Sequence, residues 1–391
     1  MPQELAYAII TPYSLHKSRT GGILTRLITR TGLELAAARM FAPSRELVEK
    51  YSENIVSADD PQDRRIQELI RDYILQNFSP DPKTGVRRRV MMLLFRGDEA
   101  VRKVRSVVGN ISAGRRGGET IRDTYGDFIL DDNNQVRYFE PAVLAPPNAI
   151  EAETKLKIWA HYSDSEGGLL KDMLAYPSGQ RAEQTLVLIK PDNFRFPTGR
   201  PGNVIDFFSR TGLYIIAIKV LHMSVAEAED FYGPVREVLR ARYGAIISGT
   251  ARTALEKELG FKIAPDLEKK IADLLGPPAG DNQFENIIRF MSGRAPGECE
   301  AGTKSQPGTE KCIALVYEGV DAVRKIRDVL GPTDPNKAPP GSIRREFGSS
   351  VMINAAHASD SEDNARREMG IIRIGQENTF RKVVETAYGN I

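Results

Sequence analysis

The chain contains two copies of one long segment, and this internal repeat restricts its possible folds more than any other feature. Four pairs of segments are alike, and they keep their order along the chain. The pairs are YAIITP (7–12) with LVLIKP (186–191), TRTGL (29–33) with SRTGL (209–213), AVRKVRSVVG (100–109) with AVRKIRDVLG (322–331), and TIRDTYG (120–126) with SIRREFG (342–348). The first two pairs are about 180 residues apart and the last two are 222 apart. We therefore expect two units of one fold in tandem, with about 42 extra residues inside the second.

The extra residues of the second copy fall near 240–283. Apolar residues recur there at helical spacing among charged ones, which predicts two short helices. The stretch 293–311 is rich in glycine, proline and polar residues, which is typical of a flexible loop. We divide the chain accordingly into a first domain at 1–175, a linker at 176–184, and a second domain at 185–391 that carries the insertion and the loop.

Short apolar runs alternate with amphipathic stretches inside the second copy. TLVLIKP (185–191) and CIALVYEG (312–319) have the composition of buried strands. GNVIDFFSRTGL (202–213) has helical spacing and closes at a glycine, as helices often do. The whole order is strand, helix, strand, helix, strand, helix, strand. It predicts the α+β class, with a ferredoxin-like (βαββαβ) sandwich in each copy.

Composition narrows the partners and the compartment. Apolar residues make up 41% of the 391 residues, and the formal net charge of +2 gives no reason to expect nucleic acid or a membrane as a partner. The chain has no run of 18 apolar residues, and its first ten residues lack the features of a secretory signal. Cys299 and Cys312 are too few for a disulfide framework or a cysteine-based zinc site. We expect a cytoplasmic protein.

Two of the four histidines lie in nearly identical contexts. AHYSDSE carries His161 and AHASDSE carries His357. A neutral imidazole is a good nucleophile near pH 7, because its unperturbed pKa is about 6.5. It can attack a γ-phosphate and form a phosphohistidine, which divides one difficult transfer into two easier ones. The number of active histidines in this chain depends on how the two copies align.

Several segments of the second copy match one known family in the same order. They are 185–192, 290–293 with Phe284 before it, 323–348 and 354–370. The last contains Asn354, His357, Ala358, Ser359, Asp360 and Ser361, which fit the pattern Asn-x-x-His-(Gly or Ala)-Ser-Asp-(Ser or Gly). In this combination the second copy resembles the nucleoside diphosphate kinase family over nearly the whole family domain. A single His-x-Ser-Asp-Ser would be a weak signal, whereas the ordered set is highly specific.

The resemblance implies a role for each matching residue. His357 would carry the phosphate, Glu368 would orient its ring through a hydrogen bond with Ser359 in support, and Lys190 and Tyr232 would complete the catalytic set. The implied nucleotide contacts are Lys190 and Asn354 on the ribose, Phe284 stacked on the base, and Arg327, Arg344 and Thr333 on the phosphates. Guanidinium forks suit phosphate oxygens, and stacking tolerates any base. Mg²⁺ is implied as a cofactor carried by the nucleotide phosphates, so no protein metal ligands are named.

Taken alone, each of these residues has a plainer interpretation. An isolated arginine is more often solvated or salt-bridged than bound to phosphate, and a glutamate on a helix is usually solvated. Phe284 can instead belong to a hydrophobic core. His222 lies in an apolar strand and is interpreted as structural, and His16 has no partner motif.

The first copy is predicted to be degenerate, although its alignment with the second copy needs a gap. Aligning 141–159 with 354–372 keeps a strand followed by a helix, and it places Leu144 opposite His357 and Pro141 opposite Asn354. The alternative alignment adds 17 inserted residues to the first copy and puts His161 in the site. The helix after His161 would then contain two glycines, which are unfavourable there. We prefer the first alignment, and we interpret His161 as a look-alike on the surface.

Other active-site positions support this preference. Thr11 stands where the second copy has Lys190, and Ile111 stands where it has Thr333, whereas Arg105 and Arg122 remain. A site without the lysine, the asparagine and the histidine cannot perform this chemistry.

The sequence thus predicts a phosphotransferase of the nucleoside diphosphate kinase type. It would pass the γ-phosphate of a nucleoside triphosphate to a nucleoside diphosphate by a ping-pong mechanism through phosphorylated His357. Two alternatives stay open: a nucleotide-binding regulatory or scaffold protein with little turnover, and a phosphohistidine relay to a protein acceptor. Family domains assemble as dimers that build larger oligomers, so the resemblance implies a pseudo-dimer within the chain and, beyond it, a homo-oligomer.

Overall fold

The computed structural model divides into two compact units, the first formed by residues 1–221 and 313–391 and the second by residues 222–312. The structure describes residues 3–112, 117–300, 302–389 and 391. Residue 301, which belongs to the predicted loop 293–311, lies outside the described residues. Both copies of the repeat contribute their sheets to the first unit, and most of the second unit is the insertion of the second copy.

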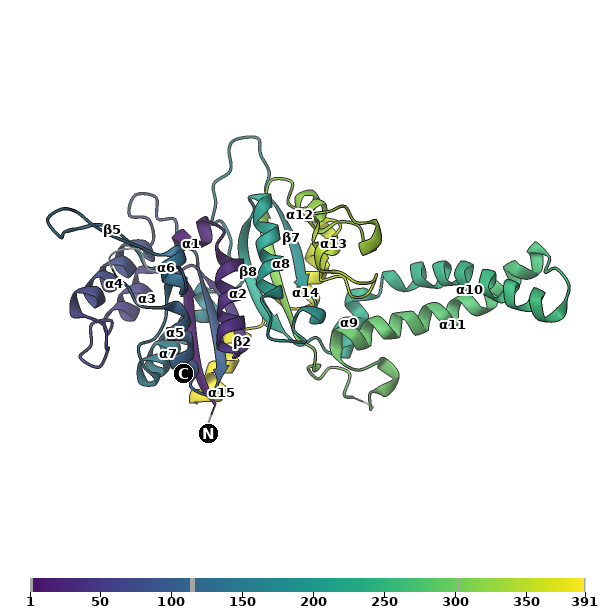
Figure 1. Ribbon diagram of the computed structural model, residues 1–391, viewed down its shortest axis with the longest axis horizontal. Coiled ribbons are helices and arrows are strands. Elements are labelled where there is room, and N and C mark those ends of the chain that lie inside the picture. The colour runs from purple at the N-terminus through teal and green to yellow at the C-terminus, as the bar shows by residue number, and fades with distance from the viewer. Residues whose placement is uncertain (1–2, 113–116, 301, 390) are drawn as a thin grey trace. The chain divides into compact units, whose positions relative to one another are not determined.

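The first copy is built on a four-stranded sheet with the strand order β2-β3-β1-β6 (Figure 1). Its main elements are β1 (Glu4–Ile10), α1 (Pro12–His16), α2 (Thr20–Thr31), β2 (Glu34–Phe41), α3 (Arg45–Ser52), α4 (Arg64–Asn77), β3 (Val90–Gly97), α5 (Ala100–Val108), α6 (Ile121–Tyr125), β6 (Val143–Leu144) and α7 (Ala149–Glu166). A small hairpin, β4 (Asp127–Leu130) with β5 (Val136–Glu140), stands between α6 and β6.

The second copy repeats this order in a sheet with the sequence β8-β9-β7-β10. Its elements in the first unit are β7 (Glu183–Ile189), η1 (Pro191–Asn193), α8 (Arg200–Phe208), η2 (Ser209–Thr211), β8 (Tyr214–Leu221), β9 (Cys312–Gly319), α12 (Ala322–Leu330), η4 (Pro335–Lys337), α13 (Ile343–Phe347), β10 (Ala356–Ala358), α14 (Glu362–Ile371) and α15 (Thr379–Tyr388). The prediction of two ferredoxin-like α+β copies is confirmed, because each sheet has its second strand at one edge and its fourth at the other.

The two copies pack against each other along equivalent elements. Helix α2 lies beside α8, and β2 lies beside β8 (Figure 1). Gly21 and Gly202 permit the close approach of the helices, because a Cβ on either glycine would lie 2.4 Å from the other's carbonyl oxygen. Thr25 Oγ1 donates to the carbonyl of Gly199 at 3.0 Å, and the Arg89 guanidinium lies 5.0 Å from the Tyr214 ring centroid. The interface therefore joins like surfaces of the two copies.

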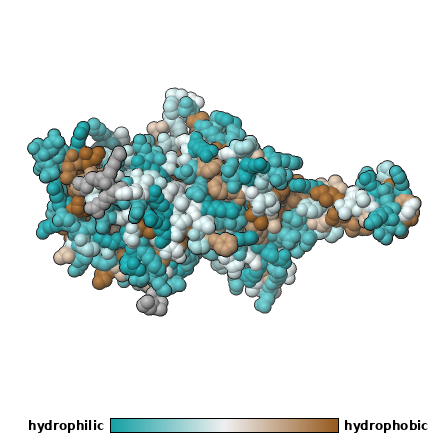
Figure 2. Space-filling model, in the orientation of Figure 1, coloured by the Kyte–Doolittle hydropathy of each residue, from teal (hydrophilic) through white to brown (hydrophobic). Residues whose placement is uncertain are grey.

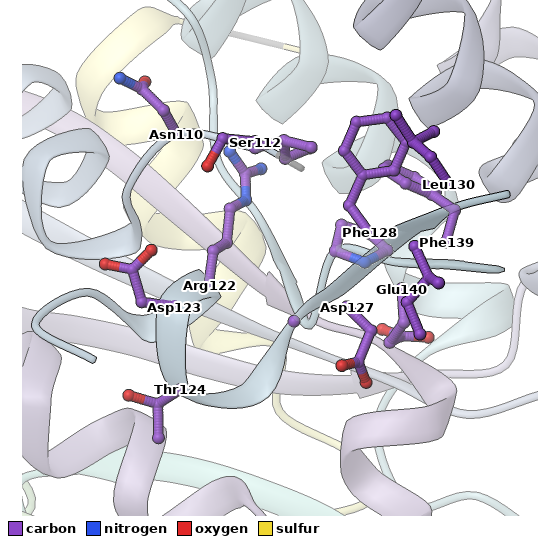
Figure 3. Close-up of a pocket in the computed structure, with 14 residues that line it drawn as sticks. Asn110, Ser112, Arg122, Asp123, Thr124, Asp127, Phe128, Leu130, Phe139 and Glu140 are labelled. Carbon is purple, nitrogen blue, oxygen red and sulfur yellow. The ribbon is translucent and has the colours of Figure 1, made fainter. Parts of the chain in front are cut away.

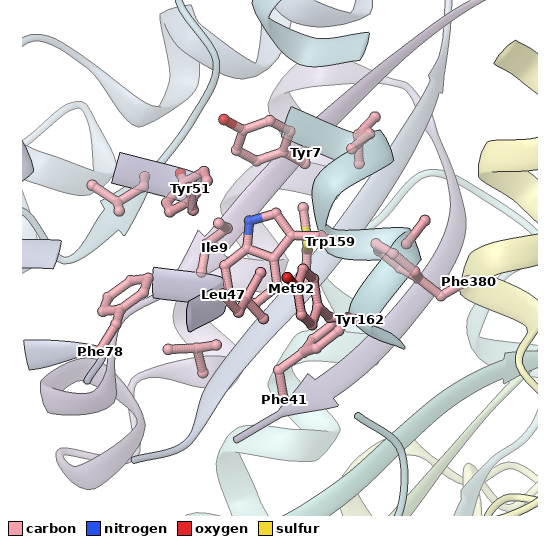
Figure 4. Close-up of a cluster of buried hydrophobic side chains, with 14 of the residues drawn as sticks. Tyr7, Ile9, Phe41, Leu47, Tyr51, Phe78, Met92, Trp159, Tyr162 and Phe380 are labelled. Atoms are coloured by element: carbon pink, nitrogen blue, oxygen red, sulfur yellow. The ribbon is translucent and has the colours of Figure 1, made fainter. Parts of the chain in front are cut away.

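The last helix of the chain completes the core of the first copy. Phe380 and Val384, on α15, are buried in the cluster that includes Phe41 and Trp159 (Figure 4). The ring of Phe41 makes edge contacts with Trp159 at 4.9 Å and with Phe380 at 5.4 Å. The end of the second copy is thus part of the hydrophobic core of the first.

The second unit is a long antiparallel helical hairpin. It consists of α9 (Val225–Tyr232), α10 (Val235–Leu259), α11 (Pro265–Ser292) and η3 (Pro296–Glu298). Helices α10 and α11 are both longer than the two short helices that the sequence predicts within 240–283. They approach closely at Gly244 and Gly276, where a Cβ on Gly276 would lie 2.8 Å from the Gly244 Cα. Figure 2 shows apolar residues along this hairpin, and Val238, Ile246, Leu259 and Leu274 are among the exposed ones.

Candidate active site

The strand that carries His357 is short and follows a residue in the left-handed conformation. Ala355 has a φ of 69°, which a non-glycine residue adopts rarely. Strand β10 then pairs antiparallel with β7, so that His357 lies opposite Leu188. The His357 side chain is 23% exposed, which leaves part of the ring at the protein surface.

A buried carboxylate holds the imidazole of His357 from one side. Glu368 Oε2, on α14, lies 2.9 Å from His357 Nε2 and accepts a hydrogen bond from Ser359 Oγ at 2.6 Å. Helix α14 is positioned by Ser361, whose side chain accepts from the backbone N–H of Asn364 at its N-terminus. A carboxylate that accepts from Nε2 keeps the proton on that atom, so the lone pair of the neutral ring lies on Nδ1.

Lys190 and Asn354 form the start of a polar network beside this histidine. Lys190 follows β7, and its Nζ donates to Asn354 Oδ1 at 2.9 Å and to the carbonyl of Met352. Asn354 Nδ2 donates in turn to the carbonyl of Thr333 at 3.1 Å. Both side chains are almost fully buried, so these hydrogen bonds fix them relative to β7 and β10.

Arg344 extends the network from the other side. Its guanidinium, on α13, donates to the carbonyls of Gly331 at 3.0 Å and Ala356 at 3.3 Å, and lies 3.5 Å from Thr333 Oγ1. The contact with Ala356 brings this cation to the residue that precedes His357. The predicted residues Lys190, Asn354, Thr333, Arg344, His357, Glu368 and Ser359 are therefore brought together by the structure.

Arg327 is exposed on α12, near the histidine segment. The pKa of the Asp360 carboxyl is lowered, first by the hydrogen bond from Asn364 and also by the positive charge of Arg327. Asp360 comes three residues after His357, so the charge of Arg327 acts on the segment that carries the histidine.

Tyr232 and Phe284 belong to the second unit. Tyr232 is the last residue of α9, with its ring 5.0 Å from that of Phe231. Phe284 is buried on α11, and the Arg236 guanidinium lies 5.4 Å from its ring centroid. Phe284 therefore packs within its own unit. The catalytic role of Tyr232 and the contact of Phe284 with the base both stay predictions.

The register of the first copy decides between the two alignments of the sequence. Ile9 and Leu188 are equivalent in the repeat, and Ile9 pairs with Leu144 as Leu188 pairs with His357. Ala142 has a φ of 59° and repeats the left-handed conformation of Ala355. The alignment that places Leu144 at the histidine position is confirmed.

Other positions of the first copy have changed their chemistry together. Thr11, at the lysine position, donates to Glu140 Oε1 at 2.9 Å, and Tyr73 donates to Glu140 Oε2 at 2.6 Å. Burial raises the pKa of the Glu140 carboxyl. Lys155, at the position of Glu368, donates to the carbonyl of Tyr51 at 2.9 Å. Thr11, Tyr73 and Glu140 thus bond to one another, and Lys155 bonds to the backbone, where the second copy has its histidine site.

In the first copy, a carboxylate of the chain itself pairs with one of the two retained arginines. Asp60 Oδ1 lies 3.4 Å from a terminal nitrogen of Arg105, the residue equivalent to Arg327. Arg122 holds the carbonyls of Gly109 and Val143, as Arg344 holds those of Gly331 and Ala356. Arg122 has thus kept the backbone contacts of its counterpart, and Asp60 places a negative charge beside Arg105 that opposes binding of a phosphate.

A cavity of about 720 Å³ lies beside Arg122 in the first copy (Figure 3). The hairpin β4–β5, helix α6 and the loop after α5 line it. Its lining includes Asp123, Asp127 and Glu140, and Arg122 is the one cationic side chain among the described residues that line it. Acidic side chains therefore outnumber cationic ones among the described residues that line this cavity.

His161 lies exposed on α7, with its ring against that of Tyr162. Ser163 and Asp164 of the same motif hold the C-terminal helix. Asn378 donates to Ser163 Oγ at 2.6 Å and to Asp164 Oδ1 at 2.7 Å, and Arg381 forms an ion pair with Asp164 at 2.7 Å. The Ser-Asp-Ser motif of the first copy therefore has a structural role in this chain.

Two further properties bear on cofactors and membranes. Among the residues that the structure describes, no group of three or more histidine, cysteine or acidic side chains could hold a metal ion. None of the helices in the described part of the chain combines the length and apolar character needed to cross a bilayer.

Sequence reasoning missed the residues that hold the backbone around Ala355. Asp192, Asn193 and Arg200 form hydrogen bonds there, as set out below. A signal was present in the repeat, because Asp192 and Asn193 stand where the first copy has Tyr13 and Ser14.

The fold and the His357 cluster define a ferredoxin-like protein with a carboxylate-oriented histidine among cationic side chains. The family model described as nucleoside diphosphate kinase matches residues 4–136, 183–251 and 303–377. A nucleoside diphosphate kinase of Campylobacter hominis is 31% identical over 195 residues, which cover 50% of this chain and 98% of that protein. One of Wolinella succinogenes is 33% identical over 195 residues, with the same coverage. A solved structure of an NDP kinase from Pyrobaculum aerophilum shares 27% identity and covers 49% of this chain and 95% of that one, with a TM-score of 0.32. The chain belongs to the nucleoside diphosphate kinase family, and it carries the family domain in duplicate.

Proposed function

We propose that the second copy is a nucleoside diphosphate kinase, which transfers the γ-phosphate of a nucleoside triphosphate to a nucleoside diphosphate through phosphorylated His357. The observation that carries this proposal is the 2.9 Å contact of His357 Nε2 with Glu368, at the edge of a network that contains Lys190 and Arg344. The relatives of similar sequence are named nucleoside diphosphate kinases and cover half of this chain.

The reaction has two half-reactions that are chemically the reverse of each other. In the first, Nδ1 of His357 attacks the γ-phosphorus, an N–P bond forms, and the bond from that phosphorus to the β–γ bridging oxygen breaks. The nucleoside diphosphate leaves with the oxygen. In the second, a terminal oxygen of another nucleoside diphosphate attacks the phosphorus, and the N–P bond breaks.

Glu368 and the cationic side chains support these steps without forming bonds to phosphorus. Glu368 keeps the proton on Nε2 and stabilises the positive charge that the ring gains while Nδ1 carries phosphate. Arg344 and Arg327 stabilise the charge on the transferring oxygens, and Lys190 and Asn354 hold the ribose. Mg²⁺ bound by the nucleotide phosphates would supply further charge neutralisation, and no protein side chain is required to hold it.

In this proposal the first copy is the structural half of an intramolecular pseudo-dimer. Leu144 gives it no nucleophile, and the contacts of α2 with α8 and of α15 with the first core join the halves. Assembly of whole chains into a homo-oligomer is part of the same proposal.

The deciding experiment is transfer of label from γ-³²P-ATP, followed by a chase with unlabelled GDP. We expect acid-labile label on the wild-type protein, and we expect the chase to move it to GTP. His357→Ala should take no label. His161→Ala, which alters the matching motif of the first copy, is the matched control and should label at the wild-type rate.

Three other results would contradict the proposal. No label on a folded wild-type protein would leave a nucleotide-binding scaffold. Label that remains on the protein after the chase would indicate a relay to a protein acceptor. Label that persists in His357→Ala and disappears in His161→Ala would place the chemistry in the first copy.

A further inference from the structure

The peptide between Asn354 and His357 is held more tightly in the second copy than the left-handed conformation alone requires. Ala355 is completely buried, and its φ of 69° turns the chain so that Asn354 and His357 both face the site. The carbonyl of Ala355 accepts from the backbone N–H of Lys190 at 3.0 Å. The relative positions of Lys190, Asn354 and His357 therefore depend on this one residue.

Asn193 ties the two backbone segments together with a single side chain. Its Nδ2 donates to the carbonyl of Lys190 at 2.9 Å and to the carbonyl of Ala355 at 2.7 Å. Asn193 is 1% exposed, so neither hydrogen bond can be replaced by bulk water without opening the core.

Asp192 holds the other side of the same peptide. Its Oδ2 accepts from the backbone N–H of Ala355 at 3.2 Å and from Arg200 at 3.2 Å. Arg200 also donates to Asn193 Oδ1 at 3.2 Å and to the carbonyl of Phe347. Asp192, Asn193 and Arg200 thus form a closed set of hydrogen bonds around Ala355.

The first copy provides an internal comparison, because it has the same turn but Leu144 in place of the histidine that follows it. Ala142 has a φ of 59°, its carbonyl accepts from the N–H of Thr11, and its own N–H donates to Glu140 Oε1 at 2.9 Å. Ser14, at the position of Asn193, has a buried hydroxyl without a hydrogen-bond partner among the described residues. The left-handed turn therefore forms in the first copy without an amide that donates to two carbonyls. That amide is present in the copy in which the histidine follows the turn.

We propose that Asn193 is a positioning residue for phosphotransfer, with Asp192 and Arg200 holding it in place. This inference rests on the proposed function of the second copy. The amide of Asn193 fixes the end of β7 against the start of β10, so that the Lys190 ammonium, the Asn354 amide and the His357 imidazole meet one nucleotide. A misplacement of about 1 Å can slow such a reaction by about 100-fold.

The test replaces Asn193 by the residue of the first copy. In Asn193→Ser we expect the single-turnover rate of His357 phosphorylation by γ-³²P-ATP to fall about 30-fold, because the nucleophile is no longer aligned. The affinity for ATP should fall less than about 3-fold, because the phosphate-binding arginines are untouched. Asn203→Ser, an exposed asparagine on α8, is the matched control and should keep the wild-type rate.

The outcomes separate this inference from the proposed function. If the wild-type protein takes no label, the proposed function fails. If wild type and Asn203→Ser are both labelled, two results for a folded Asn193→Ser would overturn the positioning role. One is a labelling rate equal to that of wild type, and the other is an equal loss of ATP affinity and labelling rate. If Asn193→Ser does not fold, the variant Asp192→Asn tests the positioning role instead. It keeps an acceptor for the backbone N–H of Ala355 and weakens the contact with Arg200. A rate within about 2-fold of wild type in that variant would also overturn the inference.

Discussion

At the scale of the residue, one position of the repeat separates the two copies most clearly. The second copy has Glu368 there and the first has Lys155, and both side chains are almost fully buried on the helix that follows the last strand of their sheet. In the second copy the charge faces an imidazole, whereas in the first it faces a backbone carbonyl. The same site in the fold thus holds a reactive ring in one copy and closes the end of a helix in the other.

We expect Glu368→Gln to slow phosphorylation of His357 by about 100-fold or more, because an amide can donate to Nε2 and favour the wrong tautomer. The measurement is the rate of acid-labile labelling, with circular dichroism to confirm folding. Glu362→Gln, on the same helix α14 and paired with Arg181, is the matched control. Equal rates in both variants would contradict the role of Glu368.

Lys155 gives the first copy a pH-dependent stability. Burial lowers the pKa of its ammonium to about 8, whereas the pKa of a lysine in the unfolded chain is about 10.4. Between these values the unfolded chain binds more protons, so the contribution of Lys155 to the free energy of unfolding rises with pH. Relative to Lys155→Met, the wild type should gain about 2 kcal/mol between pH 7.5 and 10. Urea unfolding of both proteins measures this, and a constant difference would contradict it.

At the scale of the element, the strands and helices that the two copies share were predictable, because the two copies could be aligned with each other. The sequence did not predict two elements without a counterpart in the repeat, the hairpin β4–β5 and the C-terminal helix α15. Helix α11 continues through Pro277 and Pro278, which usually end a helix. Its close packing on α10 offsets the lost hydrogen bonds, and sequence periodicity does not report such tertiary contacts.

The candidate site was likewise predictable from the sequence only in part. The family motif identified the residues with reactive or charged side chains, and the register at Leu144 followed from the repeat. The contact of Asp60 with Arg105 and the amide of Asn193 join segments that are 45 and 162 residues apart. Neither contact leaves a periodic pattern, so neither could be predicted without coordinates.

Helix α15 should contribute to the stability of the copy that it does not belong to in sequence. Phe380→Ala removes a fully buried ring from the first core and should lower the free energy of unfolding by about 3 kcal/mol. Thr386→Ala, an exposed position of the same helix, is the control. Denaturant unfolding followed by Trp159 fluorescence reports the first core directly. Unchanged stability in Phe380→Ala would show that α15 does not remain docked in solution.

At the scale of the whole molecule, the interface between the copies depends on two glycines that touch. In Gly202→Leu the new Cβ would lie 2.4 Å from the carbonyl oxygen of Gly21 and from Thr25 Oγ1, so α2 and α8 must separate. We expect a lower melting temperature, with separate transitions for the two copies in calorimetry. Gly249→Ala, where a Cβ meets nothing within 4 Å, should behave as wild type. A single unshifted transition in Gly202→Leu would contradict the close packing of these helices.

The packing of α2 against α8 also has a consequence for how the protein can evolve. In an assembly of identical chains, every inherited change appears at all of the equivalent pockets at once, so a harmful loss at one cannot be spared at another. Here the two pockets are encoded by separate stretches of one gene. One half could exchange its reactive groups for stabilising ones while the other kept them, and natural selection could treat scaffold and chemistry as independent traits.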